Sequence, residues 1–121
     1  MKVVISGSRS IKSLNAEMKS RLDKIIKLNA KILIGDAYGV DNLVQAYLYW
    51  HDYQRVTVYY SRTLRNNIGN WKTVNVPGGY TKRDIVMHSK ADYGLAIWDG
   101  KSRGTKRNIE QMKGKVRVVM S

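Results

Sequence analysis

Residues 93–105, with the sequence YGLAIWDGKSRGT, decide the fold of this chain. The apolar run Tyr93–Trp98 predicts a buried strand, and the pattern from Lys106 to Lys113 predicts a helix. Between them lies a turn that contains glycine and serine. A strand that runs into such a turn and then into a helix directs backbone N–H groups and the positive end of the helix toward one spot. That spot suits a phosphate group.

The turn supplies one set of candidate ligand-binding residues. Thr105 is expected to open the helix, where its hydroxyl can cap the first turn or bind phosphate. Arg103 is a cationic group that can bind the same anion. The full set predicted from this turn is Asp99, Gly100, Ser102, Arg103, Gly104 and Thr105.

Two earlier turns repeat the arrangement after the apolar runs Val3–Ser6 and Ile32–Gly35. In the first turn, the Arg9 guanidinium can form two parallel hydrogen bonds with a phosphate or carboxylate. In the second, Asp36 can accept hydrogen bonds from ribose hydroxyls or a base amine, while Asp41 either caps a helix or binds ligand. The residues predicted to bind ligand here are Gly7, Ser8, Arg9, Gly35, Asp36, Gly39 and Asp41.

Strands and helices alternate along the whole chain, and several strands are continuously apolar. This pattern predicts one Rossmann-like, doubly wound α/β domain over 1–121, with about five mostly parallel strands and helices on both faces. Ligands of such sheets bind beyond the carboxyl ends of the strands, where all three turns would lie. Strands are expected at Met1–Ser6, Lys31–Gly35, Arg55–Tyr60, Tyr93–Trp98 and Lys115–Met120, and helices at Asn15–Leu28, Val40–Trp50, Tyr80–Ala91 and Lys106–Met112.

Ser61–Gly79 is the one long segment without a clear period. An irregular stretch of this length inside a compact domain predicts a functional loop, a mobile lid or a dimer contact. The helix that follows is expected to be capped by Thr81. It carries Arg83, a candidate catalytic or phosphate-binding cation. Trp71, inside the irregular segment, and Tyr80, at the start of this helix, could stack on a base.

Composition narrows the class of partner. The net charge of +13 indicates affinity for polyanions, including nucleic acid and phosphorylated small molecules. The chain has no cysteine and two histidines, so we expect no disulfide, no metal site and no resident cofactor. No run is long enough for a signal peptide or a membrane span, so we expect a cytoplasmic protein with no membrane partner.

Four motifs, in this order and spacing, resemble the SLOG superfamily, and its small YspA- and YpsA-related members most of all. The resemblance implies a Rossmann-like fold that binds nucleotides or nucleotide-derived ligands, in a homodimer or larger homo-oligomer. The motifs are Ser6-Gly7-Ser8-Arg9, Gly35-Asp36-Ala37-Tyr38-Gly39-Val40-Asp41, Arg83-Asp84 with Met87 and Ala91-Asp92, and Trp98 through Thr105.

Relatives within this superfamily include the LONELY GUY phosphoribohydrolases, which cleave the N-glycosidic bond of nucleoside 5′-monophosphates with an Arg and a Glu. Arg83 matches that Arg, and Gly104-Thr105 matches part of the loop motif. The expected Glu position is Asn108, which is neither a base nor a carboxylate. Glu110 lies two residues further on and faces another side of the helix.

These observations lead to three hypotheses. The first is a protein that binds a nucleotide-type ligand as a sensor or by sequestering it. The second is an N-glycosidase with altered catalytic residues, such as Asp36, Asp99 or Glu110. The third is a nucleic-acid-binding module similar to DNA-processing protein A. The sequence leaves open whether the chain is an enzyme.

Overall fold

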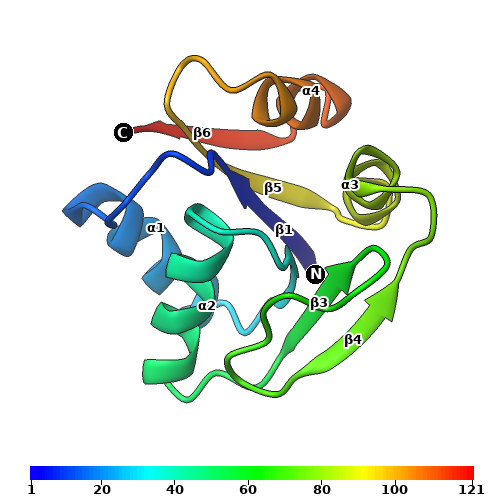
Figure 1. Ribbon diagram of the computed structural model, residues 1–121. Coiled ribbons are helices and arrows are strands. Elements are labelled where there is room, and N and C mark those ends of the chain that lie inside the picture. The colour runs from blue at the N-terminus through cyan, green and yellow to red at the C-terminus, as the bar shows by residue number, and fades with distance from the viewer.

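The computed structural model describes residues 1–121 and contains a parallel sheet of six strands, in the order β4-β3-β2-β1-β5-β6 (Figure 1). Parallel pairing runs across every neighbouring pair, from β4 to β6. This confirms the α/β class and the parallel sheet. The strands are β1 Lys2–Gly7, β2 Lys31–Gly35, β3 Val56–Tyr60, β4 Lys72–Asn75, β5 Tyr93–Trp98 and β6 Val116–Met120.

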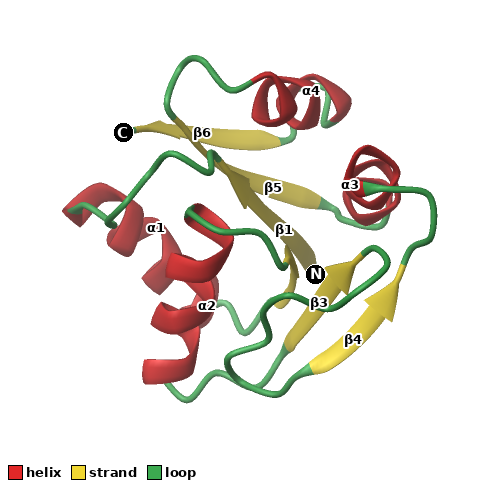
Figure 2. Cartoon of the chain, in the orientation of Figure 1, coloured by secondary structure: helices red, strands yellow, loops and turns green.

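Four helices cover both faces of the sheet. Figure 2 shows α1 and α2 on one face and α3 and α4 on the other. Crossover connections between parallel strands are right-handed. The helices therefore change from one face of the sheet to the other where the strand order reverses. The helices are α1 Ala16–Lys27, α2 Val40–Trp50, α3 Tyr80–Ser89 and α4 Arg103–Gln111.

The reversal places a switch point between β1 and β5. The chain moves outward from β1 through β2 and β3 to β4, and α3 then returns it to β5 on the other side of β1. Loops that leave β1 and β5 therefore diverge to opposite faces. A crevice opens at their carboxyl ends, as in other doubly wound sheets.

Alternating side chains of the central strands build two cores. Ile5, Ile32 and Ile34 belong to the larger cluster, which includes α1 and α2 residues such as Leu22 and Val44. Their neighbours in sequence point to the opposite face, because side chains alternate along a strand. On that face Val4 and Leu33 pack in a smaller cluster with Met87 of α3 and Met112.

The sheet has six strands where about five were expected, because part of Ser61–Gly79 is a strand. Lys72–Asn75 pairs with β3 as the edge strand β4. Three of its four residues are exposed and only Val74 is half-buried. An exposed edge strand needs neither a continuous apolar run nor a regular alternation, so its sequence carries little strand signal.

The helix caps differ from expectation at two places. Asn15 caps α1 as expected, since its side chain accepts the Met18 N–H at 2.9 Å. Helix α3 begins at Tyr80 after Gly79, so Thr81 lies inside the first turn and is not the cap. Helix α4 begins three residues earlier than expected, and Ser102, not Thr105, is its cap. The serine satisfies the N–H of the third helical residue, which is the usual capping geometry.

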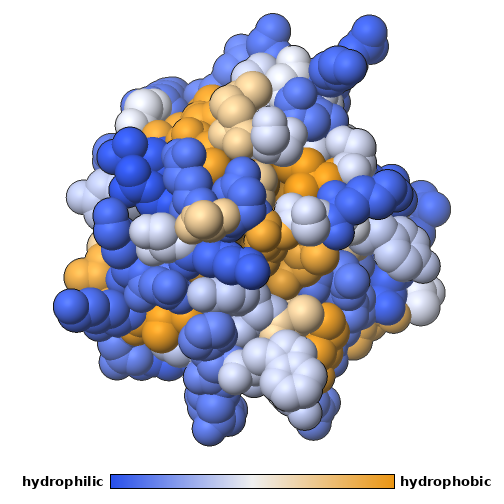
Figure 3. Space-filling model, turned by 90° about the vertical axis from the view of Figure 1, so that its left-hand side faces the viewer, coloured by the Kyte–Doolittle hydropathy of each residue, from blue (hydrophilic) through white to orange (hydrophobic).

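None of the four helices combines the length and the apolar character that a membrane crossing requires. Figure 3 shows one face of the molecule, on which hydrophilic residues predominate and hydrophobic residues form patches between them.

Candidate functional site

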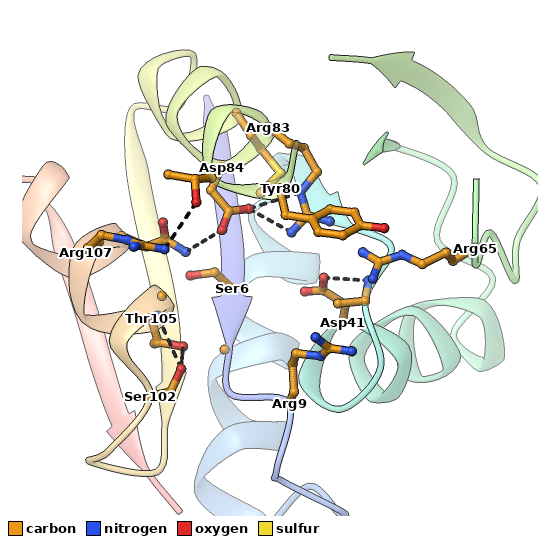
Figure 4. A pocket seen from close by; sticks show the side chains of 16 residues that line it. Ser6, Arg9, Asp41, Arg65, Tyr80, Arg83, Asp84, Ser102, Thr105 and Arg107 are labelled. Carbon is orange, nitrogen blue, oxygen red and sulfur yellow. Dashed lines mark hydrogen bonds and ion pairs between the residues drawn. The ribbon is translucent and has the colours of Figure 1, made fainter. Parts of the chain in front are cut away.

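A cavity of about 180 Å³ lies beyond the carboxyl end of β1. Its walls come from the turn after β1, the start of α2, the β3–β4 loop and the first turns of α3 and α4. Figure 4 shows side chains from all of these elements directed toward one centre. The cavity therefore occupies the switch point, as the topology leads one to expect.

Four arginines line this cavity: Arg9, Arg65, Arg83 and Arg107. Only two carboxyl groups, those of Asp41 and Asp84, share it with them. Guanidinium groups remain charged in proteins and present donors in a fork that matches phosphate or carboxylate oxygens. The local charge excess therefore suits an anion.

Two helix N-termini add to this positive field. Ser102, Gly104 and Thr105 of the α4 start line the cavity, and Tyr80 and Thr81 of the α3 start line its other side. The Gly79 cap of α3 makes no side-chain hydrogen bond to the helix. At Gly104 the nearest atom to an added Cβ would be 3.8 Å away, so the first turn of α4 is sterically open there. Unpaired N–H groups at a helix start bind anions readily.

Asp36 lies beneath the cavity and holds two of its arginines. One oxygen accepts hydrogen bonds from Arg65 Nη2 and Arg83 Nη1, both at 2.8 Å. The other accepts the Arg65 backbone N–H at 2.9 Å. Burial alone would raise the pKa of Asp36, but the hydrogen bonds and charge of Arg65, together with Arg83, hold that pKa below its usual range. Asp36 does not line the cavity, so its oxygens serve to position the arginines.

Arg83 is held from two sides. Its Nε and Nη2 donate to one oxygen of Asp84 at 3.1 and 2.8 Å, while Nη1 reaches Asp36. The Tyr80 ring lies against both guanidinium groups, 4.0 Å from Arg65 Cζ and 5.5 Å from Arg83 Cζ. Such cation–π contacts and ion pairs fix the orientation of the two arginines before any ligand arrives.

Asp41 presents a carboxyl group to the cavity. Its side chain accepts the Ala37 N–H at 3.0 Å through Oδ2, whereas Oδ1 accepts no hydrogen bond from the chain and points into the cavity in Figure 4. The residue is 6% exposed. Burial raises the pKa of Asp41 to about 7; Arg83 and the Ala37 N–H oppose this rise, and Asp84 and Asp36 add to it. Near neutral pH this group can give or take a proton.

Glycines allow the close packing around these groups. A Cβ on Gly35 would lie 2.6 Å from Asp41 Oδ2 and 2.9 Å from Arg83 Cζ. At Gly39 a Cβ would lie 2.5 Å from the Arg9 backbone, and the φ of 77° disfavours any other residue. Gly7 lines the cavity. Gly35 and Gly39 do not line it, but they leave room for the residues that do.

Ser8 and Asp99 shape the rim. The Ser8 hydroxyl accepts the Asp99 N–H at 3.0 Å. One Asp99 oxygen accepts the N–H groups of Lys101 and Ser102, both at 2.8 Å, and the other accepts the Ser10 hydroxyl at 2.6 Å. The bond from Ser10 and the two backbone N–H groups hold the pKa of Asp99 well below its usual range. Gly100, at a φ of 80°, completes this turn, and none of these groups except Ser102 lines the cavity.

Arg103, Glu110 and Trp71, which were also predicted for the site, neither line the cavity nor hold a group that does. Arg103 is exposed and does not line the cavity. Glu110 is exposed and does not line the cavity; it lines an adjoining hollow along α3 and α4, which shares Thr81, Asp84, Arg107 and Asn108 with the cavity. Trp71 is buried in the larger core, where its indole N–H donates to the Tyr53 carbonyl at 2.9 Å. Because the indole ring of Trp71 packs in the core, it is not available to stack on a base.

Asn108, at the position where a Glu was expected, does line the cavity. It is buried, and its Nδ2 donates to Asp84 Oδ2 at 3.4 Å. The Asn108 amide therefore donates a hydrogen bond to the Asp84 carboxylate, and position 108 adds no carboxylate to the site.

Sequence reasoning missed several lining residues. Arg65 lies in a segment with no periodic pattern, so the sequence did not indicate that its side chain would reach the cavity. Asp84 belongs to a motif that carries the resemblance but was not assigned to the site. Arg107 could have been found, because it lies within three residues of Thr105, a predicted site residue. The lining residues that were not predicted are Ser6, Ala37, Arg65, Thr81, Asp84, Met87 and Arg107.

Comparison of the chain with protein-family models, with curated proteins and with solved structures gave no match in any of the three.

Proposed function

We propose that the chain binds a nucleotide or nucleotide-derived ligand through its phosphate in the cavity at the switch point. The observation that carries this proposal is the convergence of four arginines and two helix N-termini on one hollow. Charge-assisted hydrogen bonds from arginine and backbone N–H groups are the usual way in which proteins hold phosphate.

Other groups of the cavity suit the rest of such a ligand. Tyr80 is 44% exposed, so one part of its ring can contact a base while the arginines contact another. Asp84 and Asn108 offer polar atoms that can meet sugar hydroxyls. The resemblance to the SLOG superfamily implies this ligand class and a homo-oligomer. Because Asn108 stands where a catalytic Glu is expected, the role that we propose is that of a sensor or a sequestering protein.

Thermal unfolding with a panel of ligands tests the proposal. The panel holds AMP, cyclic nucleotides, NAD, ADP-ribose and a short single-stranded oligonucleotide, each at low and physiological salt. A ligand at 100 times its Kd stabilises the native state by about 2.7 kcal/mol, which is a shift of several degrees. A mononucleotide shift that survives salt supports the proposal, and no shift with any nucleotide contradicts it.

Two arginines of α4 provide a matched pair of variants. Arg107 lines the cavity and Arg103 does not, although both are exposed. We expect Arg107→Gln to weaken nucleotide binding about tenfold, roughly 1.4 kcal/mol, because a charged donor to phosphate is lost. Arg103→Gln is expected to leave the Kd within twofold. Equal losses in titration calorimetry would mean that only the overall charge matters.

A shift confined to the oligonucleotide and lost at higher salt would favour nucleic-acid binding instead. The net charge of +13 supports this second reading, since phosphate contacts made by Lys and Arg release counterions and are strongly salt-dependent.

N-glycosidic hydrolysis is a further candidate, favoured by one observation. Asp41 carries a pKa raised to about 7, while Asp84 in the same cavity is ion-paired with Arg83. Cleavage of the bond between a base and its sugar requires one group that protonates the departing base and a second group that stays an ionised carboxylate. Two carboxyl groups in different environments can divide these roles. Chromatography of AMP incubated with the protein tests it: adenine and ribose 5-phosphate are the expected products, and their absence removes this candidate.

A further inference from the structure

Ser6 and His88 form a buried pair beside the cavity that the proposed binding role does not use. Ser6 is the last buried residue of β1 and lines the cavity, where Figure 4 shows its side chain directed toward α4. His88, on α3, does not line the cavity. Its Nε2 lies 3.4 Å from Ser6 Oγ, and its Nδ1 lies 2.8 Å from the Asp84 carbonyl oxygen. The two residues are 7% and 4% exposed.

The second contact determines the tautomer of the histidine. A carbonyl oxygen can only accept, so Nδ1 carries the proton and Nε2 offers its lone pair. The Ser6 hydroxyl is therefore the donor to Nε2. Hydroxyl, imidazole and orienting carbonyl thus stand in the order that an activated serine requires, and apo sites often show such hydrogen bonds at long distance.

The surroundings keep this imidazole neutral. Burial lowers the pKa of His88; the hydrogen bond to the Asp84 carbonyl and the Asp84 charge oppose this, and the Arg83 charge adds to it. Asp84 and Arg83 lie on the same helix as His88, and the group that faces it from β1 is the Ser6 hydroxyl. A neutral imidazole at pH 7 is able to accept a proton from serine.

We propose that Ser6 is a nucleophile toward a phosphate monoester held in the cavity, with His88 as its general base. The proposal rests on the binding of phosphate at this place and goes beyond it, because it assigns a reaction at phosphorus. The substrate class is a nucleotide-type phosphate monoester.

The reaction has two halves. Ser6 Oγ bonds to phosphorus, its proton moves to His88 Nε2, and the P–O ester bond breaks with its electron pair on the departing oxygen. That oxygen takes a proton from water and leaves as an alcohol. The resulting hydroxide then attacks the phosphoserine, Oγ departs and recovers its proton from His88, and inorganic phosphate is released. The net change is hydrolysis of the ester, with no oxidant or reductant.

The remaining walls of the cavity serve this reaction. Negative charge on the phosphoryl oxygens is balanced by Arg83 and Arg107, and by the α4 N-terminus with its open Gly104. Preorganised donors of this kind are the main source of stabilisation in phosphoryl transfer. Because Asp36 and Asp84 already hold Arg83, no large rearrangement is needed when the phosphate arrives.

Incubation of the full chain with AMP, and separately with p-nitrophenyl phosphate, tests the proposal. We expect adenosine and inorganic phosphate from AMP. We also expect a phosphoserine that peptide mapping of acid-quenched wild-type protein places at Ser6. Ser6→Ala is expected to abolish both, and His88→Gln to reduce the rate at least 100-fold. The exposed Ser13 supplies the control, since Ser13→Ala should behave as the wild type. The rate should rise with pH through an inflection below the ordinary histidine value.

The outcomes separate this inference from the binding proposal. Nucleotide binding in thermal unfolding without adenosine or phosphoserine overturns the inference and leaves the binding. Nitrophenolate release with phosphoserine at Ser6, but with no nucleotide binding, supports the nucleophile and contradicts the nucleotide ligand. Adenine and ribose 5-phosphate as the AMP products overturn it in favour of N-glycosidic hydrolysis. If Ser6→Ala does not fold, the site mapped in the wild-type protein decides.

Discussion

Asp36 and Asp41 belong to one turn, between β2 and α2, yet their surroundings are opposite. Asp36 receives three hydrogen bonds from two arginines, and its pKa falls below the usual range. Asp41 receives one backbone N–H bond, and its pKa rises to about 7. Both side chains are buried, so burial alone does not decide the charge of a carboxyl group; the hydrogen bonds and positive charges that oppose the effect of burial decide it as well.

The difference assigns the two residues to different tasks. Asp36 has both oxygens occupied and lies below the cavity, so it is part of the scaffold that positions Arg65 and Arg83. Asp41 has one free oxygen directed into the cavity, so it can meet a ligand. One turn thus delivers a structural carboxylate and a ligand-facing carboxyl.

Asp36→Asn is expected to have the largest effect. The substitution leaves Arg83, which is nearly buried, with one fewer negative partner, and it replaces an acceptor of three hydrogen bonds with an amide. Breaking a buried charge pair from one side costs roughly 3–5 kcal/mol of unfolding free energy. Urea denaturation at pH 7 measures this cost.

The control for this experiment is Asp52→Asn. Asp52 is exposed, and its φ of 52° suits asparagine as well as aspartate. We expect a change below about 0.5 kcal/mol at this position. Similar losses in the two variants would show that Asp36 has no special place in the scaffold.

Asp41→Asn is expected to change the pH dependence of stability. The folded pKa of Asp41 lies above its unfolded value, so the native state binds the extra proton between pH 4 and 7. Its contribution to stability is therefore complete below about pH 4 and is lost as pH rises through about 7. An amide removes this loss, roughly 4 kcal/mol in all, because it is neutral throughout.

Urea denaturation of the wild type and of Asp41→Asn between pH 5 and 8 measures the effect. The variant should become more stable than the wild type above pH 7. Asp36 has the opposite sign, since a lowered pKa stabilises the native state above the unfolded value and loses that stability only in acid. Parallel pH profiles for wild type and Asp41→Asn would contradict the raised pKa.

Arg65→Gln is expected to have the smallest effect of the three. The side chain is 20% exposed, and Asp36 keeps both the backbone N–H of residue 65 and the guanidinium of Arg83. We expect a loss of about 1–2 kcal/mol and an upward shift of the pKa of Asp36 toward its ordinary value. Denaturation measures the first effect and carboxyl NMR the second, with exposed Arg55→Gln as control. An unchanged pKa of Asp36 would remove Arg65 from the account.

Much of the fold was predictable because local and global signals agree. Apolar runs such as Tyr93–Trp98 mark the central strands, and Asn15 marks the start of α1. The edge strand β4 was not predictable, because an exposed strand does not need a buried face. The start of α4 was misplaced because Ser102 and Thr105 are both good capping residues, and only the three-dimensional turn selects between them.

The position of the site was predictable, but the separate tasks of its residues were not. The turns after β1, β2 and β5 were identified, and they do lie at the same edge of the sheet. Which aspartate would be occupied by arginine depended on Arg65, which comes from the aperiodic segment between β3 and β4. The pairing of Ser6 with His88 joins residues 82 positions apart, and no local pattern reports it.

The most direct test of this account is carboxyl-carbon NMR of Asp36 and Asp41 from pH 3 to 9, with and without AMP. We expect Asp41 to titrate near 7 and to shift when AMP binds, while Asp36 titrates below its usual range and responds little. Two ordinary titrations near pH 4, or a response to AMP at Asp36 alone, would contradict the assignment of Asp41 to the ligand and of Asp36 to the scaffold.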